Sequence, residues 1–570
     1  MRSTRATVRI VTLALLIAPL LAACVAQSGP ATPTAPAAPA ATSGALVPAT
    51  PAASPATGAA QRGGIFTIAE LGPLPKTLHP YPDSSNYSDA WLDVASLIGS
   101  GGLLDLDANT LEYVPYLASD WNVSPDGKTF TFRLRDGLKW SDGQPIVVDD
   151  FLFAWQNASN PDNDFVSLAD LARIASVTAP DAKTIVISLK EALARDVAIG
   201  VVNTVGPVPQ HVWRGKPWND PAGNPEILRP TVVGGAYVLK EWKEAESATF
   251  ARNPSWFKGL ASFEQVVLKP GQQPTVAYEL LKSGQAQWAR QIPPAQYSEA
   301  KRDPNVTMFE WTAANSSFRV LDFNLQNPFL KDKRVREALA RAVNRQDLIQ
   351  VAEQNLGQAQ YSFLSSANTK WSSANVDKYD FDLNRSKQLL QEVGYTLAGG
   401  HLLDPSSQPI RLTVLYPVSS GPRAKIAAYL QQQYKQLGID VDVKGLDANA
   451  FFEEAKQKHF DLSINTWGGG GIDPDNAKSQ LMTGGTQNYT SFSNPTVDDL
   501  FKRGAGELDE ARRKQIYDQL QQIVSQELPS FYLYAQSSFS PMSKQVLGAQ
   551  PNKLDRLDYN DALTRWSLAQ

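Results

Sequence analysis

The sequence predicts an α/β fold for the second half of the chain and a smaller, mixed α+β subdomain in the first half. Three observations lead to this prediction. The chain has 570 residues, more than one hydrophobic core can organise, so two or more domains are expected. Hairpin patterns cluster between residues 101 and 205, whereas helical and strand patterns alternate from residue 332 onward.

Composition narrows the possible functions before any motif is considered. The chain is 43% hydrophobic and has a net charge of -4, which offers no electrostatic footprint for nucleic acid. Its one cysteine excludes a disulfide framework and any site built from several cysteines. Its four histidines lie far apart in the sequence, which leaves little material for a metal site or a catalytic triad. The composition favours a binding protein, and we expect neither a metal nor a cofactor.

Residues 1–23 read as a secretory signal peptide. Three arginines precede an apolar run from Ile10 to Ala23. As a helix this run would span about 21 Å, which is shorter than the hydrocarbon core of about 30 Å. A positive start followed by a short apolar run is typical of a signal peptide rather than of a membrane span.

The sole cysteine ends the segment Leu21-Ala-Ala-Cys24, which resembles the bacterial lipobox. In that motif the cysteine is diacylated on its sulfur and becomes the new N-terminus. The alternative is a chance cysteine beside an ordinary cleavage site. Since the only cysteine lies at the one position that the motif requires, we expect Cys24 to anchor the protein to the outer side of a membrane, either periplasmic or at the cell surface.

Residues 24–62 read as a tether. No charged residue occurs between Arg9 and Arg62, and residues 30–60 are almost wholly Ala, Pro, Thr, Ser and Gly. Such a segment cannot bury enough apolar surface to offset its loss of conformational entropy, so we expect it to be disordered. Fully extended it would reach on the order of 100 Å, so only the lipid would touch the membrane.

The body opens with a short strand, Gly63–Ile68. Two similar units follow at residues 123–135 and 177–190, and in each a Pro-Asp turn leads into apolar residues at alternate positions. This pattern predicts antiparallel hairpins with one buried face. A helix is expected between them, near Asp149–Asn157.

The second half repeats helix and strand. Apolar residues at helical spacing predict helices over Asp332–Val343, Arg423–Leu437, Asp509–Gln526 and near Asp447. Alternating or continuous apolar runs predict strands at Ile439–Val443, Phe460–Trp467 and Phe531–Ala535. Gly438 is expected to end the helix before it.

Six stretches carry a family resemblance. Leu134-Arg-Asp-Gly-Leu-Lys-Trp-Ser-Asp-Gly-Gln-Pro145 runs into Asp149-Asp-Phe-Leu-Phe-Ala-Trp155, and its Trp-Ser-Asp-Gly turn is the most specific feature. The others are Tyr116–Thr129, Gly234–Trp242, Arg252–Trp256, Asp332–Leu339 and Asn494–Asp498. Together, from about residue 63 to residue 560, they resemble the dipeptide/oligopeptide-type solute-binding proteins of ABC importers, solute-binding protein family 5.

The resemblance implies a two-lobed, periplasmic-binding-protein-like clamp of type II with an extra small subdomain. Lobe I would comprise residues 63–100, 206–313 and 536–570, the subdomain residues 101–205, and lobe II residues 314–535. The chain would cross between the lobes near Asn315 and Ala535, so both crossings are hinge candidates.

Parts of the most specific stretch have structural explanations. Asp142-Gly143 suits a tight turn, because glycine accepts a positive φ. Trp140 and Trp155 are expected in the core rather than as ligand platforms. Val147 stands where the family commonly has a threonine, so the loss of its hydroxyl should weaken the helix start slightly. The adjacent pair Asp149/Asp150 is expected to complement the helix dipole.

The candidate ligand loop follows the Phe460 strand. Ligands of α/β lobes gather at the carboxyl ends of strands, glycines let a backbone approach a ligand, and Trp467 could form an aromatic wall. The alternative is a flexible turn with a buried tryptophan. The proposed ligand-binding residues of this loop are Trp467, Gly468, Gly469, Gly470, Asp473 and Asn476.

In the family this loop lines the cavity, and peptide-binding members typically place an aspartate at the position of Gly470. That aspartate pairs with the peptide's ammonium, so its absence puts capture of the amino terminus in doubt. Asp473 or Asp475 could substitute, although a turn and a helix cap would explain them equally.

Other candidates come from segments that resemble cavity-lining regions of the family. Tyr361, Trp371 and Tyr416 are proposed as ligand-binding rings, and Trp91 is a fourth ring of this kind, with core packing as the alternative for each. Lys370, Arg423 and Arg319 are possible partners for a peptide carboxylate, with surface solvation as the alternative.

The resemblance implies a monomeric extracytoplasmic receptor that binds peptides between its lobes and delivers them to the permease and ATPase of an ABC importer. The glycine at position 470 keeps an oligosaccharide or another non-peptide solute open. A secreted hydrolase is a distant alternative, because no G-x-S-x-G, H-E-x-x-H, complete lactamase or P-loop motif occurs. An adhesion or sensory protein with the same fold is a third class.

Overall fold

The computed structural model describes residues 60–61, 63–70, 74–80, 89–163, 165, 167–270, 275–312, 316–418, 421–468, 473–550 and 565–569. They all belong to one compact unit, Gly58–Gln570. The expected signal peptide, Cys24 and most of the expected tether lie outside the described residues. Within the described ranges, no helix combines the length and the apolar character needed to cross a bilayer.

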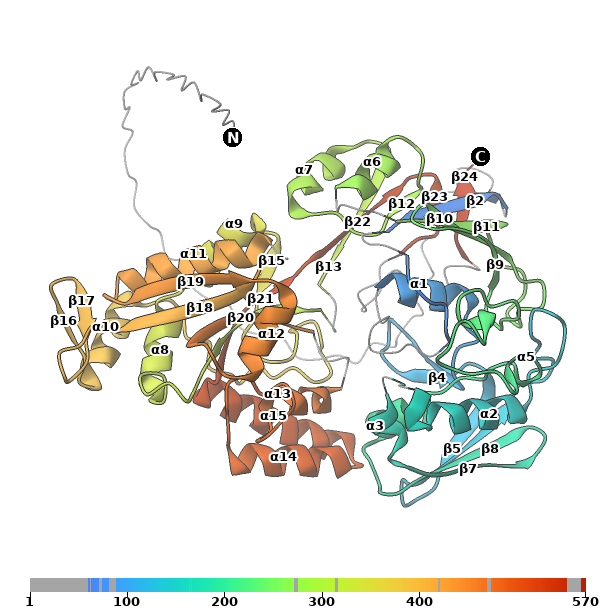
Figure 1. Ribbon diagram of the computed structural model, residues 1–570, viewed down its shortest axis with the longest axis horizontal. Helices are drawn as coiled ribbons and strands as arrows, with labels where there is room; N and C mark the ends of the chain where they lie inside the picture. The colour runs from blue at the N-terminus through green and yellow to red at the C-terminus, as the bar shows by residue number, and fades with distance from the viewer. Residues whose placement is uncertain are drawn as a thin grey trace, which may run out of the picture. The chain divides into compact units, whose positions relative to one another are not determined.

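A seven-stranded sheet joins a strand near each end of the body to five strands from residues 237–311. Its strand order is β13-β22-β12-β2-β11-β10-β9, with β2 parallel to both β11 and β12 (Figure 1). Because β2 holds the expected strand at Gly63–Ile68, that prediction is confirmed. The strands are β2 Ile65–Ala69, β9 Tyr237–Lys243, β10 Ser247–Arg252, β11 Gln265–Lys269, β12 Trp288–Ala289, β13 Val306–Trp311 and β22 Ser538–Ser543.

Aromatic rings fill the core of this sheet. Phe66 stacks on Phe263 with 4.6 Å between ring centroids, and Trp288 and Trp566 pack edge to face at 6.0 Å. These rings come from distant parts of the sequence, so their burial joins the two ends of the body. The associated helices are α1 Asp89–Ile98, α6 Val276–Lys282 and α7 Pro294–Arg302.

A four-stranded antiparallel sheet, in the order β5-β6-β8-β7, forms the centre of the small subdomain. Both predicted hairpins are confirmed, since β5 pairs with β6 and β7 with β8. Buried residues alternate along β6 and β8, as expected for a sheet with one covered face. The elements are β5 Ala118–Val123, β6 Thr129–Leu134, β7 Ile174–Asp181, β8 Thr184–Leu189, α2 Val148–Ala158, α3 Leu168–Leu171 and α4 Arg195–Val202.

The start of α2 differs from the prediction. Asp150 is buried, and its carboxylate accepts hydrogen bonds from the backbone N–H of Val147 at 3.0 Å, from Trp140 Nε1–H at 3.1 Å and from the backbone N–H of Gln210 at 3.0 Å. It therefore does more than complement a helix dipole, because its carboxylate accepts from the N–H of Val147, the N-cap residue. The side chain of Val147 itself accepts no hydrogen bond, so that half of the usual cap is absent. Trp140 is 1% exposed, which confirms its place in the core, and Gly143 adopts the expected positive φ of 88°.

A six-stranded sheet organises the second half of the chain in the order β15-β21-β14-β20-β18-β19. The predicted strands at residues 439–443, 460–467 and 531–535 correspond to β19, β20 and β21. Leu462 and Ile464 of β20 pack on one face, while Ser463 and Asn465, which alternate with them, are also buried. The strands are β14 Phe318–Phe323, β15 Gly357–Ala359, β18 Arg411–Pro417, β19 Asp440–Leu446, β20 Leu462–Trp467 and β21 Ser530–Gln536.

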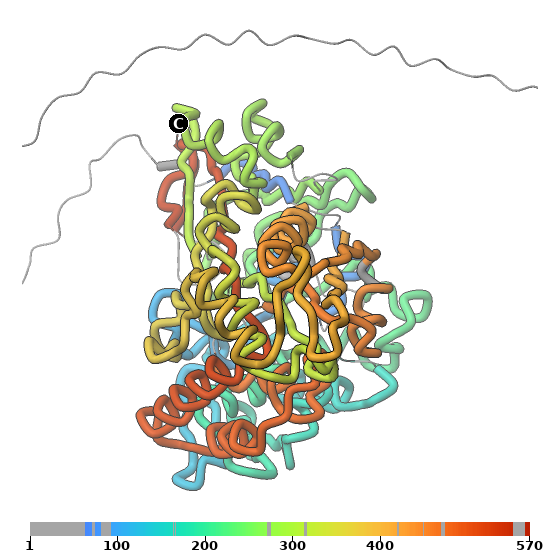
Figure 2. Tube along the Cα trace, turned by 90° about the vertical axis from the view of Figure 1, so that its left-hand side faces the viewer, coloured from blue at the N-terminus to red at the C-terminus, as the bar shows by residue number. Residues whose placement is uncertain are grey.

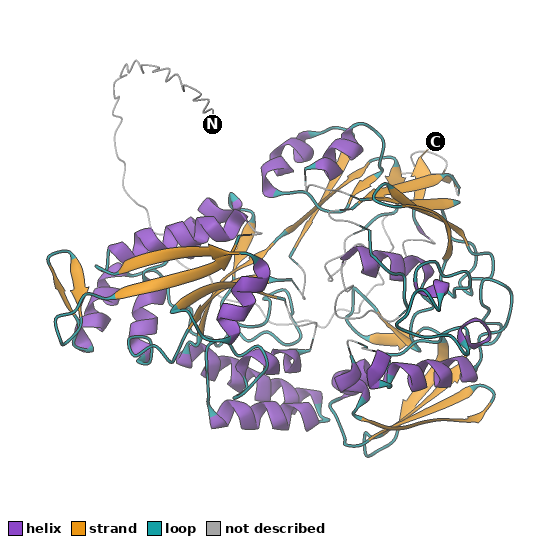
Figure 3. Ribbon diagram, viewed as in Figure 1, coloured by secondary structure: helices purple, strands orange, loops and turns teal. Residues whose placement is uncertain are grey.

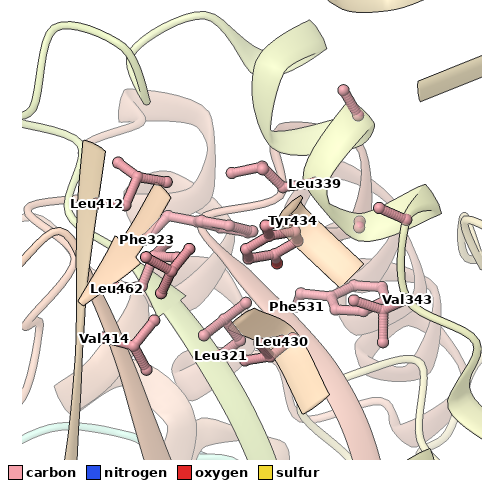
Figure 4. Close-up of a cluster of buried hydrophobic side chains, with 14 of the residues drawn as sticks. Leu321, Phe323, Leu339, Val343, Leu412, Val414, Leu430, Tyr434, Leu462 and Phe531 are labelled. Atoms are coloured by element: carbon pink, nitrogen blue, oxygen red, sulfur yellow. The ribbon is translucent and has the colours of Figure 1, made fainter. Parts of the chain in front are cut away.

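Helices cover both faces of this sheet, as Figure 3 shows. One face packs on α8 Lys333–Arg341, α9 Arg345–Glu353, α10 Leu383–Glu392 and α11 Gly421–Lys435, and Figure 4 shows its core. The other face packs on α12 Ala448–Lys456, α14 Pro495–Gly506 and α15 Glu510–Glu527. Helices α14 and α15 lie side by side in Figures 1 and 2. The helices predicted in this half are therefore confirmed, and Gly438 has the expected positive φ of 80°.

The chain passes between the seven-stranded and the six-stranded sheet twice. It leaves β13 and enters β14 across residues 312–317, and it returns from β21 to β22 at Ser537. The hydroxyls of Thr312 and Ser537 lie 3.3 Å apart, so the two passages are neighbours. Asn315 lies outside the described residues, whereas Ala535 is inside β21. The residue boundaries expected for the two lobes and the subdomain remain a prediction.

The remaining elements are short. They are β1 Ala60–Gln61, β3 Leu104–Leu106, β4 Tyr113–Pro115, β16 Thr396–Ala398, β17 His401–Leu403, β23 Val546–Leu547, β24 Ser567–Ala569, α5 Gln210–Trp213, α13 Lys478–Leu481, η1 Pro161–Asn163, η2 Pro225–Ile227 and η3 Pro474–Ala477.

Candidate functional site

Several strands of the six-stranded sheet begin or end along the same side of the sheet, which is called the candidate edge below. Strands β18 and β20 are parallel and end together at this edge. Phe318, the first residue of β14, pairs with Trp467 at the end of β20 and with Ala535 near the end of β21. Both passages to the seven-stranded sheet start here. Ligands of α/β sheets bind outside the carboxyl ends of strands, so this edge is the candidate site.

A row of polar side chains crosses the sheet one position in from this edge. Arg319 of β14 pairs in register with Thr466 of β20 and with Tyr534 of β21. Arg319 is 6% exposed, and its Nη1 donates a hydrogen bond to Thr466 Oγ1. Arg423, in the first turn of α11, donates from Nη2 to the same hydroxyl oxygen. Two guanidinium groups therefore meet at one neutral acceptor.

The two arginines are not neutralised by an ion pair within the described part of the chain. The Nε atoms of both are buried without a hydrogen-bond acceptor. Burial, together with the charge of Arg319, lowers the pKa of Arg423 to about 10. The side chain stays cationic at neutral pH, but it lies in an environment that would favour an added negative charge.

The carboxylate of Glu353, at the end of α9, interacts electrostatically with Arg319 and Tyr534 of this row. It is 3% exposed and accepts hydrogen bonds from Tyr534 Oη at 2.9 Å and from Gln536 Nε2 at 3.4 Å. Burial raises the pKa of Glu353, and these hydrogen bonds and the charge of Arg319 offset part of the shift. Burial and the Glu353 carboxylate also raise the pKa of Tyr534.

The predicted aromatic wall, Trp467, is largely enclosed. Its ring is 8% exposed and stacks on Tyr489 with 5.7 Å between centroids. Its Nε1–H points to Asp322 Oδ1 at 3.4 Å. Asp322 is fully buried and also accepts from Asn465 at 2.6 Å and from Ser530 at 2.7 Å. In this structure the ring of Trp467 packs in the core, and its role as a ligand wall stays a prediction.

The glycines of the candidate loop are described only in part. A Cβ atom at Gly468 would meet nothing within 4 Å, so a side chain at this position would have room. Gly469 and Gly470, with residues 471 and 472, lie outside the described residues.

Asp473 belongs to a structural ion pair, which argues against its predicted role as a ligand-binding carboxylate. Its oxygens accept from Arg513 Nη1 at 2.6 Å and from Arg513 Nη2 at 2.7 Å, and Oδ1 also caps the short helix η3 through the N–H of Asp475 at 2.9 Å. Asp475 is 3% exposed and bonds Tyr517 Oη at 3.1 Å and Lys478 Nζ at 2.8 Å. Neither carboxylate is free to replace an aspartate at Gly470. Asn476 is exposed on η3.

The other predicted rings fall in separate environments. Trp371 is 1% exposed, so its ring lies in the core in this structure, 4.8 Å from the Arg513 guanidinium. Tyr361 is half-buried under the guanidinium of Arg345 at 4.7 Å. Tyr416 is half-buried at the carboxyl end of β18, near the candidate edge. The side chain of Trp91 is not among those that the structure describes.

Lys370, predicted as a possible partner of a peptide carboxylate, is already bound. Its Nζ lies 3.0 Å from Asp196, 3.4 Å from Glu112 and 3.0 Å from Glu510. Burial lowers the pKa of Lys370, but Asp196 and Glu510 more than offset it, so the pKa is raised. Since Asp196 and Glu112 belong to the small subdomain, Lys370 joins that subdomain to the helices of the six-stranded sheet.

A cavity of about 440 Å³ lies elsewhere, between α1 and the small subdomain. Its wall is mostly apolar and includes Trp140, Phe165 and Trp213, and none of its residues comes from the six-stranded sheet. Its Asn203 amide is already bonded to both backbone groups of Leu104. The described residues contain no cluster of three His, Cys, Asp or Glu side chains that could hold a metal ion.

Sequence reasoning named Arg319 and Arg423 but could not distinguish them from surface cations, and it missed Glu353, Thr466 and Tyr534. One signal was present. Arg319 is a lone positive charge in an otherwise apolar strand segment, Phe318-Arg-Val-Leu321. A charge in a strand that is buried on both faces needs a special reason.

Three comparisons with known proteins all find extracellular or transporter-associated binding proteins. The family model of bacterial extracellular solute-binding proteins, family 5, matches residues 112–489. The chain is 27% identical to a probable ABC transporter-binding protein of Deinococcus radiodurans, over 86% of this chain and 90% of that protein. It is 24% identical to the dipeptide-binding protein of Escherichia coli, over 80% of this chain and 87% of that protein. The structure of the oligopeptide-binding protein AppA of Bacillus subtilis with a nonapeptide matches with a TM-score of 0.72 at 21% identity, over 90% of this chain and 100% of that chain.

Proposed function

Since the chain belongs to family 5 of the bacterial extracellular solute-binding proteins, we propose that it captures peptides outside the cytoplasm and delivers them to the permease of an ABC importer. The proposal draws its ligand class from the dipeptide-binding and oligopeptide-binding relatives. The family's clamp fold is the premise for the mechanism. Ligand contacts from both lobes would stabilise a closed form, which the permease would recognise.

The single observation that carries the mechanism is the pair of passages between the two large sheets. Both leave the candidate edge, and their hydroxyls at Thr312 and Ser537 are 3.3 Å apart. A rotation about two adjacent strands would move one sheet relative to the other while leaving each sheet intact. Closure would then bring lobe I against the row that contains Arg319 and Thr466.

Isothermal titration calorimetry with pools of short peptides and pools of oligosaccharides tests the ligand class. We expect heat from peptides and none from sugars. Binding of the sugar pool without binding of the peptide pool would retire the peptide proposal. That alternative has a specific basis, because Gly470 replaces the family's ammonium-binding aspartate, and Asp473 is committed to Arg513.

We further propose that Cys24 carries the lipid and that the protein turns over no substrate. The Cys24→Ser variant, expressed in the native cell, should leave the membrane fraction, because a cysteine sulfur is the site of acylation. Mass spectrometry of the native N-terminal peptide should find the lipid on Cys24. A Cys24→Ser protein that stays membrane-bound would contradict the anchor, and release of a product from a peptide or glycoside panel would contradict the absence of catalysis.

A further inference from the structure

We propose that Lys370 and Asp196 form the centre of an electrostatic latch, which holds the small subdomain against helices α14 and α15 without any contribution from the ligand. The inference rests on the proposed function, because a clamp that opens and closes needs contacts between its moving parts. It adds a conformational device whose attractive partners all belong to this chain. The latch would set how far the unliganded protein is already closed.

The ion pairs of the latch connect two parts of the chain. Lys370 Nζ lies 3.0 Å from Asp196 and 3.4 Å from Glu112 of the small subdomain, and 3.0 Å from Glu510 at the start of α15. The side chains of Lys370 and Asp196 are each 16% exposed, whereas those of Glu112 and Glu510 are 45% and 61% exposed. Water screens an exposed ion pair more than a shielded one, so the Lys370–Asp196 pair supplies most of the attraction.

Contacts without a net charge join the same two parts. The N–H of Ala194, directly before α4, donates to the carbonyl of Ala505 in α14 at 2.7 Å. A Cβ atom at Gly127, in the turn between β5 and β6, would meet the side chain of Leu508 at 3.2 Å. Because a hydrogen bond and a close packing contact accompany the ion pair, the two surfaces meet in one defined orientation.

The cation of the latch rests on the same ring as the arginine that anchors the candidate loop. Lys370 Nζ lies 5.6 Å from the ring centroid of Trp371, and the guanidinium of Arg513 lies 4.8 Å from it. Arg513 in turn binds both carboxylate oxygens of Asp473, the residue at which the candidate loop ends. Since Trp371 is 1% exposed, one buried ring connects the latch with the end of the loop.

Tyr113 of β4 experiences charges from both sides of the latch. Burial, together with the charges of Asp196 and Asp473, raises the pKa of its hydroxyl to about 12, although Lys370 acts in the opposite direction. Asp196 belongs to the small subdomain and Asp473 to η3, so this hydroxyl is close to both parts. It stays neutral at physiological pH and therefore adds no charge that would repel Asp196.

The first experiment measures hydrogen exchange by mass spectrometry in the full chain without added peptide. Lys370→Met should raise the exchange rate at the Ala194 amide by roughly fivefold, because an ion pair of this kind contributes about that factor to an equilibrium. Lys502→Met removes the same charge from an exposed site on α14 and should leave the rate unchanged. Fragments from β20 report on the fold and should exchange equally in all three proteins. Equal rates at Ala194 would overturn the latch.

A variant on the other side of the latch keeps the test independent of one substitution. Asp196→Asn should raise the exchange rate at Ala194 by a similar factor. The double variant with Lys370→Met should raise it little further, because each single variant already removes the same ion pair. Effects of the two substitutions that simply add would overturn the pairing of Lys370 with Asp196.

A second measurement keeps failure of the latch separate from failure of the peptide proposal. Sodium chloride shortens the Debye length from about 10 Å at about 0.1 M to about 3 Å at about 1 M, which weakens the ion pairs. The radius of gyration of the wild type and of Lys502→Met, without peptide, should therefore grow with salt. That of Lys370→Met should be larger at low salt and change less. Identical radii and salt responses in all three proteins would overturn the latch even if peptides bind. The selective response without calorimetric binding of the peptide pools would instead overturn the peptide proposal.

Discussion

Asp473 and Arg513 show how one ion pair can fix the residue at which the candidate loop after β20 ends. Arg513 is 3% exposed in its side chain and Asp473 is 14% exposed, so the pair is largely removed from water. The guanidinium also lies 4.8 Å from the Trp371 ring and donates through Nε to the carbonyl of Gly504 at 2.8 Å. The loop after β20 is therefore fastened at residue 473 to helix α15.

Replacing Arg513 by methionine should lower the free energy of unfolding by about 3 to 5 kcal/mol, because it leaves a buried carboxylate without its partner. The neighbouring Arg512 has a 64% exposed side chain and forms ion pairs at the surface. Arg512→Met should therefore change the free energy of unfolding by less than about 1 kcal/mol. Urea denaturation measures both. If Asp473→Asn weakened ligand binding without lowering stability, Asp473 would be a ligand residue after all.

Glu353 predicts a pH dependence of stability. Burial raises its pKa in the folded state above the unfolded value of about 4.3, so the folded protein binds more protons between the two values. The contribution of Glu353 to stability is therefore complete below about pH 4.3 and is lost as the pH rises through the raised folded pKa.

Glu353→Gln removes this titration and keeps an acceptor for Tyr534. Between about pH 4.3 and neutral pH, the stability of the wild type relative to Glu353→Gln should fall as the pH rises. Urea denaturation at several pH values measures the difference. A constant difference, or one that grows with pH, would contradict the raised pKa.

Among the secondary-structure elements, α2 shows how one buried carboxylate can stabilise the start of a helix whose N-cap side chain accepts no hydrogen bond. Three donors converge on Asp150 from the turn before the helix, from the core and from the segment that follows residue 209. Asp149, its neighbour in the sequence, is exposed and can act only through its charge. Two adjacent carboxylates therefore contribute to the same helix by different physical routes.

Asp150→Ala should lower the free energy of unfolding by about 2 to 4 kcal/mol, because three donors lose their acceptor. Asp149→Ala should lower it by no more than about 1 kcal/mol, the usual size of a charge–dipole interaction. Chemical denaturation of both variants gives the comparison. Equal effects would mean that the charge, and not the hydrogen bonds, stabilises the start of α2.

On the scale of the whole molecule, Lys370 links two parts of the chain that are separate in the sequence. Two of its carboxylate partners, Glu112 and Asp196, belong to the small subdomain, and the third, Glu510, belongs to α15. A second contact joins the same parts, because the N–H of Ala194 donates to the carbonyl of Ala505 at 2.7 Å. We expect such contacts to add to the stability of the closed clamp.

Small-angle scattering should show a smaller radius of gyration when a binding peptide is added. Lys370→Met should weaken peptide affinity by roughly fivefold, if the lost ion pairs contribute about 1 kcal/mol to the closed form. Lys502→Met, an exposed lysine on α14, should not change the affinity. Calorimetry measures the affinities. A ligand that binds without any compaction would contradict the clamp mechanism.

The sequence by itself determined the local elements. The hairpins of the small subdomain and the long helix α15 were predicted because their periods of two and of 3.6 residues involve neighbours in the chain. The family and the clamp fold were also predicted, because stretches such as the Trp-Ser-Asp-Gly turn resemble the family's motifs and follow in the expected order. Of the candidate site, the sequence placed only the strand end at Trp467 and a set of unranked cations.

Only the tertiary structure decided which of these side chains act together. Asp473 meets Arg513 across 40 residues of sequence, and Arg319 meets Thr466 across 147. A pairing over such distances depends on strand order and helix packing, and no local pattern encodes it. The same dependence decided that Trp371 is buried and that Lys370 is already paired, because burial and charge balance belong to the folded chain and not to any segment of it.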